Sequence, residues 1–372
     1  MSAIYLHIPF CKRMCGYCDF FKSAKLQELP RVIDAMEREI ADERGFLEGE
    51  PLRTIYFGGG TPSLVHPDDL ARLLDHIAAH YDVSGVSEIT LEANPDDLSL
   101  EYLQSLRSAG INRLSIGIQS FDDRELKFMN RRHSSQQAVE AVAMARQAGF
   151  ENITIDLIFG VDGFGEHILR GSIAQALALD VQHISAYHLT LESGTPFGRK
   201  AARGALKAVS QEQSDLEYHI VDELLTAAGF EHYEVSNYAK PGFRSRHNSS
   251  YWQGVKYLGI GAGAHSYNGR VRRWAVESVV GYLAGGVARY EHENLTPCDH
   301  YNEFIMTSLR CCEGVDLAIL EQRFEKKYVD FFLSNVKRWL QEGKLSVKNG
   351  RIFIPANHFL ISDLIIESLF YC

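Results

Sequence analysis

The sequence predicts an α/β protein: a partial (β/α) barrel followed by a smaller C-terminal domain of helices and a short hairpin, similar in shape to a winged helix. Apolar runs alternate with stretches of helical periodicity, which favours parallel strands joined by right-handed helical crossovers. An Ala-Gly-apolar sequence recurs at 109–111, 148–150 and 228–230, where glycine can adopt the left-handed conformation that ends a helix. A flat, doubly wound sheet has the same periodicity and stays open as an alternative.

The predicted elements alternate along the chain. A strand containing Tyr5 comes first, and buried strands follow at 52–57, 88–92, 113–118, 152–159 and 183–187. Helices are predicted from Pro30, around 70–77, at 99–109 and 166–178, and after Ser210, with capping-box signatures at Asp122 and Ser134. Beyond 295, helices at 301–311, 317–324 and 331–342 precede a hairpin at 343–354 that turns at Asn349-Gly350.

Composition narrows the class of protein. The net charge of −10 argues against a nucleic-acid backbone as the main partner. No apolar run is long enough to span a membrane, and the N-terminus lacks the basic start of a signal peptide. Seven cysteines, three of them clustered, fit a reducing compartment. We therefore expect a soluble cytoplasmic protein.

The first functional signal is the trio Cys11, Cys15 and Cys18, which directly follows the first strand. Thiolates at this spacing can converge on one side of a loop and hold an iron–sulfur cubane, leaving one iron open. The alternative is a zinc site with three cysteines, completed by His7 or Asp19.

The pattern Cys-x3-Cys-x-Tyr-Cys resembles that of the radical S-adenosylmethionine (SAM) proteins. The resemblance implies a barrel of the radical SAM type, with a [4Fe-4S] cluster on Cys11, Cys15 and Cys18 and SAM chelating the fourth iron. It also implies that SAM contacts residues near the ends of the strands, where barrel enzymes place their chemistry: Tyr5, Gly59, Gly60, Thr61, Glu92, Gln119, Arg131 and Asp156. The family usually continues with Leu-Pro after Gly160, whereas this chain has Val161-Asp162.

Two features indicate the branch of the family. Oxygen-independent coproporphyrinogen III oxidases have a fourth cysteine where this chain has Phe20, and the HemW-type haem chaperones have phenylalanine there. The stretch His247-Asn248-Ser-Ser-Tyr251-Trp252 also matches a motif of the HemW branch. The imidazole could ligate haem iron, and the aromatic rings could pack on a macrocycle. The alternative reading is that His247 caps a loop while Tyr251 and Trp252 fill the core.

These expectations divide the chain into a radical SAM barrel at 1–236, a segment with the haem motif and a return to the SAM site at 237–294, and the C-terminal domain at 295–372. The resemblance implies a haem chaperone that binds haem, a [4Fe-4S] cluster and SAM and delivers haem to apo-proteins, respiratory ones among the candidates. Coproporphyrinogen III dehydrogenase is the alternative function. Monomer and homodimer both stay open, and Cys298, Cys311, Cys312 and Cys372 are expected to be structural.

Overall fold

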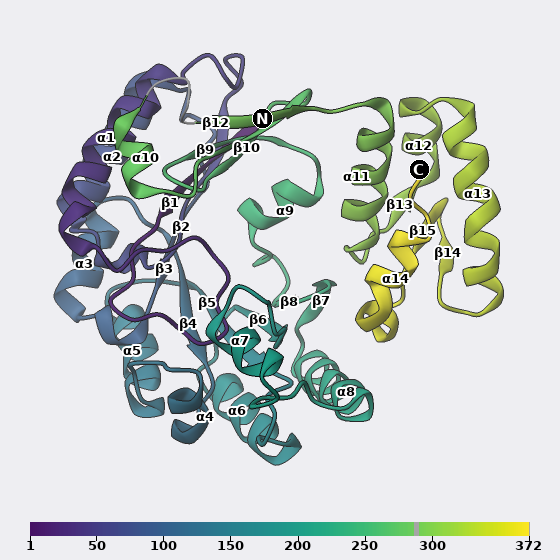
Figure 1. Cartoon of the computed structure of the whole chain (residues 1–372), viewed down its shortest axis with the longest axis horizontal. Helices are drawn as coiled ribbons and strands as arrows, with labels where there is room; N and C mark the ends of the chain where they lie inside the picture. Colours follow the sequence, from purple (N-terminus) through teal and green to yellow (C-terminus); the bar gives the residue numbers. More distant parts are fainter. Residues whose placement is uncertain (286–289, 372) are drawn as a thin grey trace.

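The computed structural model describes residues 1–285 and 290–371, so Cys372 lies outside the described residues. It is an α/β structure around one curved, twelve-stranded sheet (Figure 1). Consecutive parallel strands form its centre: β1 (Ser2–Ile8), β2 (Leu52–Gly59), β3 (Glu88–Ala93), β4 (Arg113–Gln119), β5 (Asn152–Phe159) and β6 (His183–His188). The two ends of the sheet do not pair with each other in the part of the chain described, so the predicted partial barrel is confirmed.

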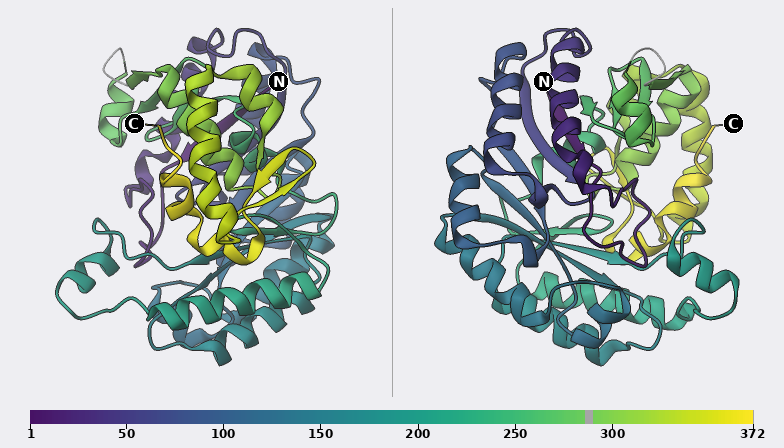
Figure 2. Two further views of the ribbon diagram at one scale, coloured as in Figure 1. Left: turned by 90° about the vertical axis from the view of Figure 1, so that its right-hand side faces the viewer. Right: turned by 60° about the vertical axis from the view of Figure 1, so that its left-hand side comes forward.

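The crossover helices cover the outer face of these strands (Figures 1 and 2). They are α1 (Leu29–Asp42), α2 (Pro67–His80), α3 (Leu100–Ser108), α4 (Asp123–Phe128), α5 (Ser135–Gln147), α6 (Glu166–Ala178) and α8 (Gln211–Ala227). The Ala-Gly-apolar sequences end helices as expected. Gly110, Gly149 and Gly229 have φ of +101°, +89° and +86°. A side chain with a Cβ rarely adopts such values, so glycine is needed there.

Both edges of the sheet are extended by short strands that the sequence did not reveal. One edge adds β8 (Asn237–Ala239) and β7 (Glu231–Glu234). The other adds β9 (Lys256–Ile260), parallel to β1, and then the antiparallel strands β10 (His265–Tyr267), β11 (Val271–Ala275) and β12 (Tyr290–Asn294). These strands are short and carry many polar residues, so they lack the apolar runs on which the prediction depended.

The C-terminal domain packs beside the open side of the barrel (Figure 2). It contains α11 (Pro297–Leu309), β13 (Val315–Asp316), α12 (Leu317–Arg323), α13 (Lys326–Gln341), β14 (Ser346–Lys348), β15 (Arg351–Phe353) and α14 (Ser362–Glu367). The hairpin is confirmed, with Asn349 and Gly350 both at positive φ. Helix α11 begins earlier than predicted because Thr296 and Asp299 form a capping box. No helix within 1–285 or 290–371 is long and apolar enough to cross a membrane.

Candidate functional site

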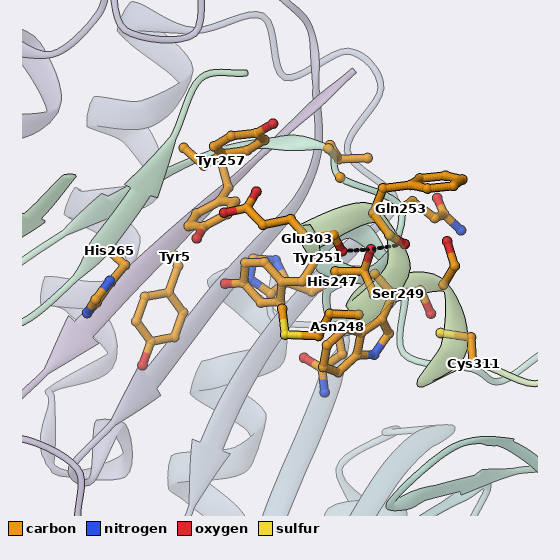
Figure 3. Close-up of a pocket in the computed structure, with 18 of the residues that line it drawn as sticks. Tyr5, His247, Asn248, Ser249, Tyr251, Gln253, Tyr257, His265, Glu303 and Cys311 are labelled. Atoms are coloured by element: carbon orange, nitrogen blue, oxygen red, sulfur yellow. Dashed lines mark hydrogen bonds between the residues drawn. The ribbon is translucent and has the colours of Figure 1, made fainter. Parts of the chain in front are cut away.

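A cavity of about 1000 Å³ lies between the barrel and the C-terminal domain. Its walls come from the cysteine loop, the strand ends, helix α9 (Arg246–Trp252), the β10–β11 ribbon and helix α11. Figure 3 shows Tyr5 and His265 at one end of this cavity, His247 and Tyr251 in the middle, and Cys311 at the other end. Segments far apart in the sequence therefore share one space.

The cysteine loop places its thiols against residues of the expected SAM site. Thr61 Oγ1 donates to Cys11 Sγ at 3.3 Å, and Arg131 Nη1 donates to Cys15 Sγ at 3.4 Å. The three cysteines are unbridged, with Cys11 buried and Cys15 and Cys18 half-buried. Within the described ranges, no three His, Cys, Asp or Glu side chains converge on one point as a single metal ion requires. A cubane needs no such convergence, because each thiolate binds a different iron.

Two half-buried carboxyl groups lie on the central strands, Glu92 near the end of β3 and Asp156 in the middle of β5. Glu92 accepts hydrogen bonds from Tyr56 Oη at 2.8 Å and from the Gly59 amide at 3.0 Å. Burial raises the pKa of Glu92 to about 7, and nearby Asp156 adds to that shift. Burial likewise raises the pKa of Asp156 to about 6. Carboxyl groups that desolvation keeps partly protonated can accept or donate hydrogen bonds to a polar ligand such as SAM.

Positions 59 and 60 must be glycine because a side chain there would clash with β1 and the residues that follow it. A Cβ on Gly59 would lie 2.5 Å from the His7 ring, and one on Gly60 would lie 2.8 Å from backbone atoms of Ile8 and Phe10. The Gly60 amide is also bonded to the Ile8 carbonyl at 2.9 Å. These amides are therefore occupied, and the backbone surface left for a ligand comes from their carbonyl groups and from Thr61.

Arg131 connects the cysteine loop to the strand ends. Its Nη2 donates to Asn94 Oδ1 at 2.6 Å and to the Gly117 carbonyl. Its Nε is buried without a hydrogen-bond partner among the described residues. An unpaired buried donor of this kind suits an anionic ligand, because leaving it unpaired is costly. Gln119, at φ +74°, lies beside this guanidinium across Gly117.

Phe20 lies at the rim of the cavity. Its side chain is 67% exposed, although it is a large hydrophobic residue. An apolar ring in this position provides a surface for a flat ligand, and it offers no thiolate for iron.

Helix α9 fixes His247 in the wall of the cavity. The ring is only 1% exposed, and both its nitrogens are hydrogen-bonded: Nδ1 to Thr54 Oγ1 at 2.8 Å and Nε2 to Tyr251 Oη at 2.9 Å. Glu88 accepts the His247 amide at 2.9 Å, which fastens the start of the helix to β3. Burial lowers the pKa of His247 to about 3, so the ring is neutral. In this geometry neither nitrogen is free to ligate iron.

The other residues of the motif line the cavity. Asn248, Tyr251 and Trp252 are half-buried, and Trp252 Nε1 has no hydrogen-bond partner in the described part of the chain. Arg310 stacks on the Trp252 ring with 5.5 Å between Cζ and the ring centroid. The motif therefore presents aromatic surface to a ligand, while its histidine is part of the cavity wall.

The sequence did not identify the residues that the late strands and α11 contribute. His265, Arg272 and Glu303 line the cavity, and Arg272 Nη1 pairs with Glu303 at 2.6 Å. Arg323 also lines it, and no carboxylate pairs with it within the described ranges. The available signal was the alternation of His265-Ser-Tyr267 and Arg272-Arg-Trp274, which puts polar and aromatic residues on one face of a strand.

Comparison with known proteins agrees with this fold. The family described as Radical SAM superfamily matches residues 5–176, and the HemN C-terminal domain matches residues 295–357. A Bacillus subtilis protein named Heme chaperone HemW is 36% identical, over 98% of this chain and 97% of its own. The protein of that name from Lactococcus lactis is 35% identical, over 98% and 96%. The Escherichia coli one is 33% identical, over 84% and 83%.

A solved structure described as coproporphyrinogen III oxidase (HemN) from Escherichia coli, a radical SAM enzyme, superposes with a TM-score of 0.85. It covers 99% of this chain and 90% of that chain at 23% identity, which shows a shared fold. The identity to the curated relatives extends over nearly the whole chain and includes both matched domains. The chain therefore belongs to the radical SAM superfamily and, within it, to the HemW family.

Proposed function

We propose that this protein is a cytoplasmic haem chaperone that holds haem, a [4Fe-4S] cluster and SAM and delivers haem to apo-proteins, respiratory ones among them. The observation that carries this proposal is the cavity of about 1000 Å³, which Phe20, helix α9 and two of the expected SAM residues, Tyr5 and Glu92, border together. Ligand cavities are usually about 300 to 1,000 Å³, so this one is large enough for a macrocycle. The names of the relatives support the same function.

The lining of the cavity suits haem. Tyr251, Trp252 and Phe20 offer aromatic faces, which pack well on a flat porphyrin. Arg323 and Arg272 offer guanidinium groups, which match the carboxylates of propionates. Arg323 has no ion-pair partner among the described residues, so it can bind a propionate without breaking an ion pair, while its guanidinium lies over the rings of Phe304 and Phe324.

The cysteine loop suits a cluster with SAM beside it. Cys11, Cys15 and Cys18 would hold the cluster, and the donors of Thr61 and Arg131 already reach two of the sulfurs. When bound, such a cluster supplies an open iron that SAM can chelate. Tyr5 of β1, Glu92 of β3 and Asp156 of β5 would surround SAM, with Gly59, Gly60, Gln119 and Arg131 around them.

The alternative, coproporphyrinogen III dehydrogenase, shares the fold and a tetrapyrrole ligand. One experiment separates the two. The full chain is reconstituted anaerobically with iron and sulfide, then incubated either with coproporphyrinogen III, SAM and a reductant, or with haem followed by haem-depleted respiratory membranes.

The proposal expects about one haem per chain, transfer of that haem to the membranes, and no decarboxylated porphyrinogen. Repeated turnover of coproporphyrinogen, or absence of haem binding, would reject it. Phe20→Cys is the informative variant, since it restores the residue type that the oxidases have at this position. Gain of turnover in that variant would locate the functional difference at Phe20.

A further inference from the structure

Among the residues that the structure describes, four histidines line the cavity: His7, His247, His265 and His300. His7 is 4% exposed, and its ring nitrogens bond to Tyr5 Oη at 3.2 Å and to the Phe21 carbonyl at 3.0 Å. Both ring nitrogens of His247 are likewise hydrogen-bonded, one to Thr54 and the other to Tyr251. Iron needs a free nitrogen lone pair, so these two rings could bind it only by leaving their hydrogen bonds.

His265 differs from these two rings in both its exposure and its hydrogen bonding. Its side chain is exposed, and neither ring nitrogen has a hydrogen-bond partner among the residues that the structure describes. The ring is nonetheless held in place, because it stacks on Trp274 with 5.9 Å between centroids and 25° between planes. Trp274 is itself fixed by the bond from its Nε1 to Glu291 Oε2 at 3.1 Å. His265 is thus an oriented imidazole with both nitrogens available.

The neighbours of His265 favour a carboxylate-bearing macrocycle. In the β10–β11 pair, His265 is opposite Trp274 and Tyr267 is opposite Arg272. Residues two apart on a strand share a face, so all four lie on one side of the ribbon. Arg272 is held over the Tyr267 ring, with 5.7 Å from Cζ to the centroid, and it lines the same cavity. One ribbon face therefore carries a metal ligand and a guanidinium group, and the latter also pairs with Glu303.

We infer that His265 of the β10–β11 ribbon ligates haem iron, and that His247 is a positioning residue that seats α9 against the barrel. This inference rests on the proposed haem binding and adds the identity of the ligand. His300 is the nearest competitor, since its ring also has no partner in the described ranges. It is less suited, because no ring stacks on it there and it lies between this cavity and a smaller one next to it.

The test is haem titration of the full-length protein, followed by absorption, electron paramagnetic resonance and resonance Raman spectra. The variants are His265→Ala, His265→Gln and, as the matched control at the other free imidazole, His300→Gln. We expect the wild type and the His300 variant to show histidine-ligated iron. Both His265 variants should lose that signature and bind haem about tenfold or more weakly. Added imidazole should restore the histidine-type spectrum in His265→Ala.

The possible failures are distinguishable. If the wild type binds no haem, the proposed function fails together with this inference. If the His265 variants keep the histidine signature, the function stands and the inference is overturned. Loss of the signature in His300→Gln with His265→Gln unchanged would assign the ligand to α11 and also overturn it. Circular dichroism checks folding, and it should show no change, because His265 lies at the surface of the cavity.

Discussion

Helix α9 and the β10–β11 ribbon border the same cavity, yet they hold their histidines in opposite ways. His247 is 1% exposed with both ring nitrogens bonded, whereas His265 is exposed, stacked on Trp274 and without a hydrogen-bond partner among the described residues. His247 belongs to a recognisable motif, and His265 does not stand out in the sequence. A sequence motif can therefore mark a residue that builds the cavity wall, while the residue available to a ligand comes from a neighbouring strand.

The largest expected effect concerns the cysteine loop. We expect a cluster to assemble there independently of His247 and His265. Cys15→Ser removes one of the three thiolates, so the cluster should not assemble, and iron should fall from about four atoms per chain to near zero. Iron analysis and electron paramagnetic resonance measure this. Cys298→Ser is the matched control, because its sulfur is bonded to the Tyr371 carbonyl far from the loop. A cluster that survives Cys15→Ser would contradict the assignment.

The next effect compares the two histidines by stability. His247→Ala removes a buried ring and leaves Thr54 and Tyr251 without partners, so it should lower the free energy of unfolding by about 3 kcal/mol. His265→Ala should change it by less than about 0.5 kcal/mol, because that side chain is exposed. Urea unfolding of the ligand-free protein measures both. Equal losses of unfolding free energy in the two variants would contradict the distinction between His247 as part of the wall and His265 as a ligand.

A third effect concerns Glu92, whose partner Tyr56 stacks on the His247 ring, and it is measured as a dependence of stability on pH. The pKa of Glu92 is raised by burial to about 7 in the folded state, so the folded protein binds a proton that the unfolded chain releases near pH 4.5. Stability should therefore fall as pH rises from about 4.5 to 7, by about 1 to 3 kcal/mol from this group.

Histidines whose pKa is lowered in the folded state, such as His247, have the opposite effect. As pH falls, the unfolded chain binds protons at these rings before the folded protein does, so they lower stability with falling pH. The readout is therefore the difference between the wild type and Glu92→Gln in urea unfolding at pH 5 and pH 8. The variant should show the flatter dependence. If the two proteins lose the same stability between these values, Glu92 is not the group that titrates.

The smallest expected effect concerns Phe20 at the rim of the cavity. Phe20→Ala should leave unfolding unchanged within about 0.5 kcal/mol, because the ring is 67% exposed. It should weaken haem binding by about threefold to tenfold, since it removes one aromatic face from the cavity. Val347→Ala, another exposed apolar side chain but on β14 outside the cavity, is the control. A loss of haem affinity in both variants would show a general surface effect.

The sequence allowed much of the barrel to be predicted, because its parallel strands are apolar runs between amphipathic helices with recognisable ends. The spacing of three cysteines in one loop also predicted a shared metal site, and their role in holding a cluster stays a prediction. The late strands β9 to β12 escaped prediction because they are short and lack long apolar runs, and because β9 depends on pairing with the distant strand β1. Whether His247 faces a ligand or a wall depends on Thr54, nearly two hundred positions away, and no local pattern encodes that contact.

The position of haem iron in crystals of the haem-loaded full chain, located by anomalous scattering at the iron edge, tests directly whether His265 ligates haem. We expect one iron peak inside the cavity, at the ribbon face that carries His265, separate from the cluster iron beside Cys11, Cys15 and Cys18. A haem iron bonded to a displaced His247 ring, or lying outside the cavity, would contradict it.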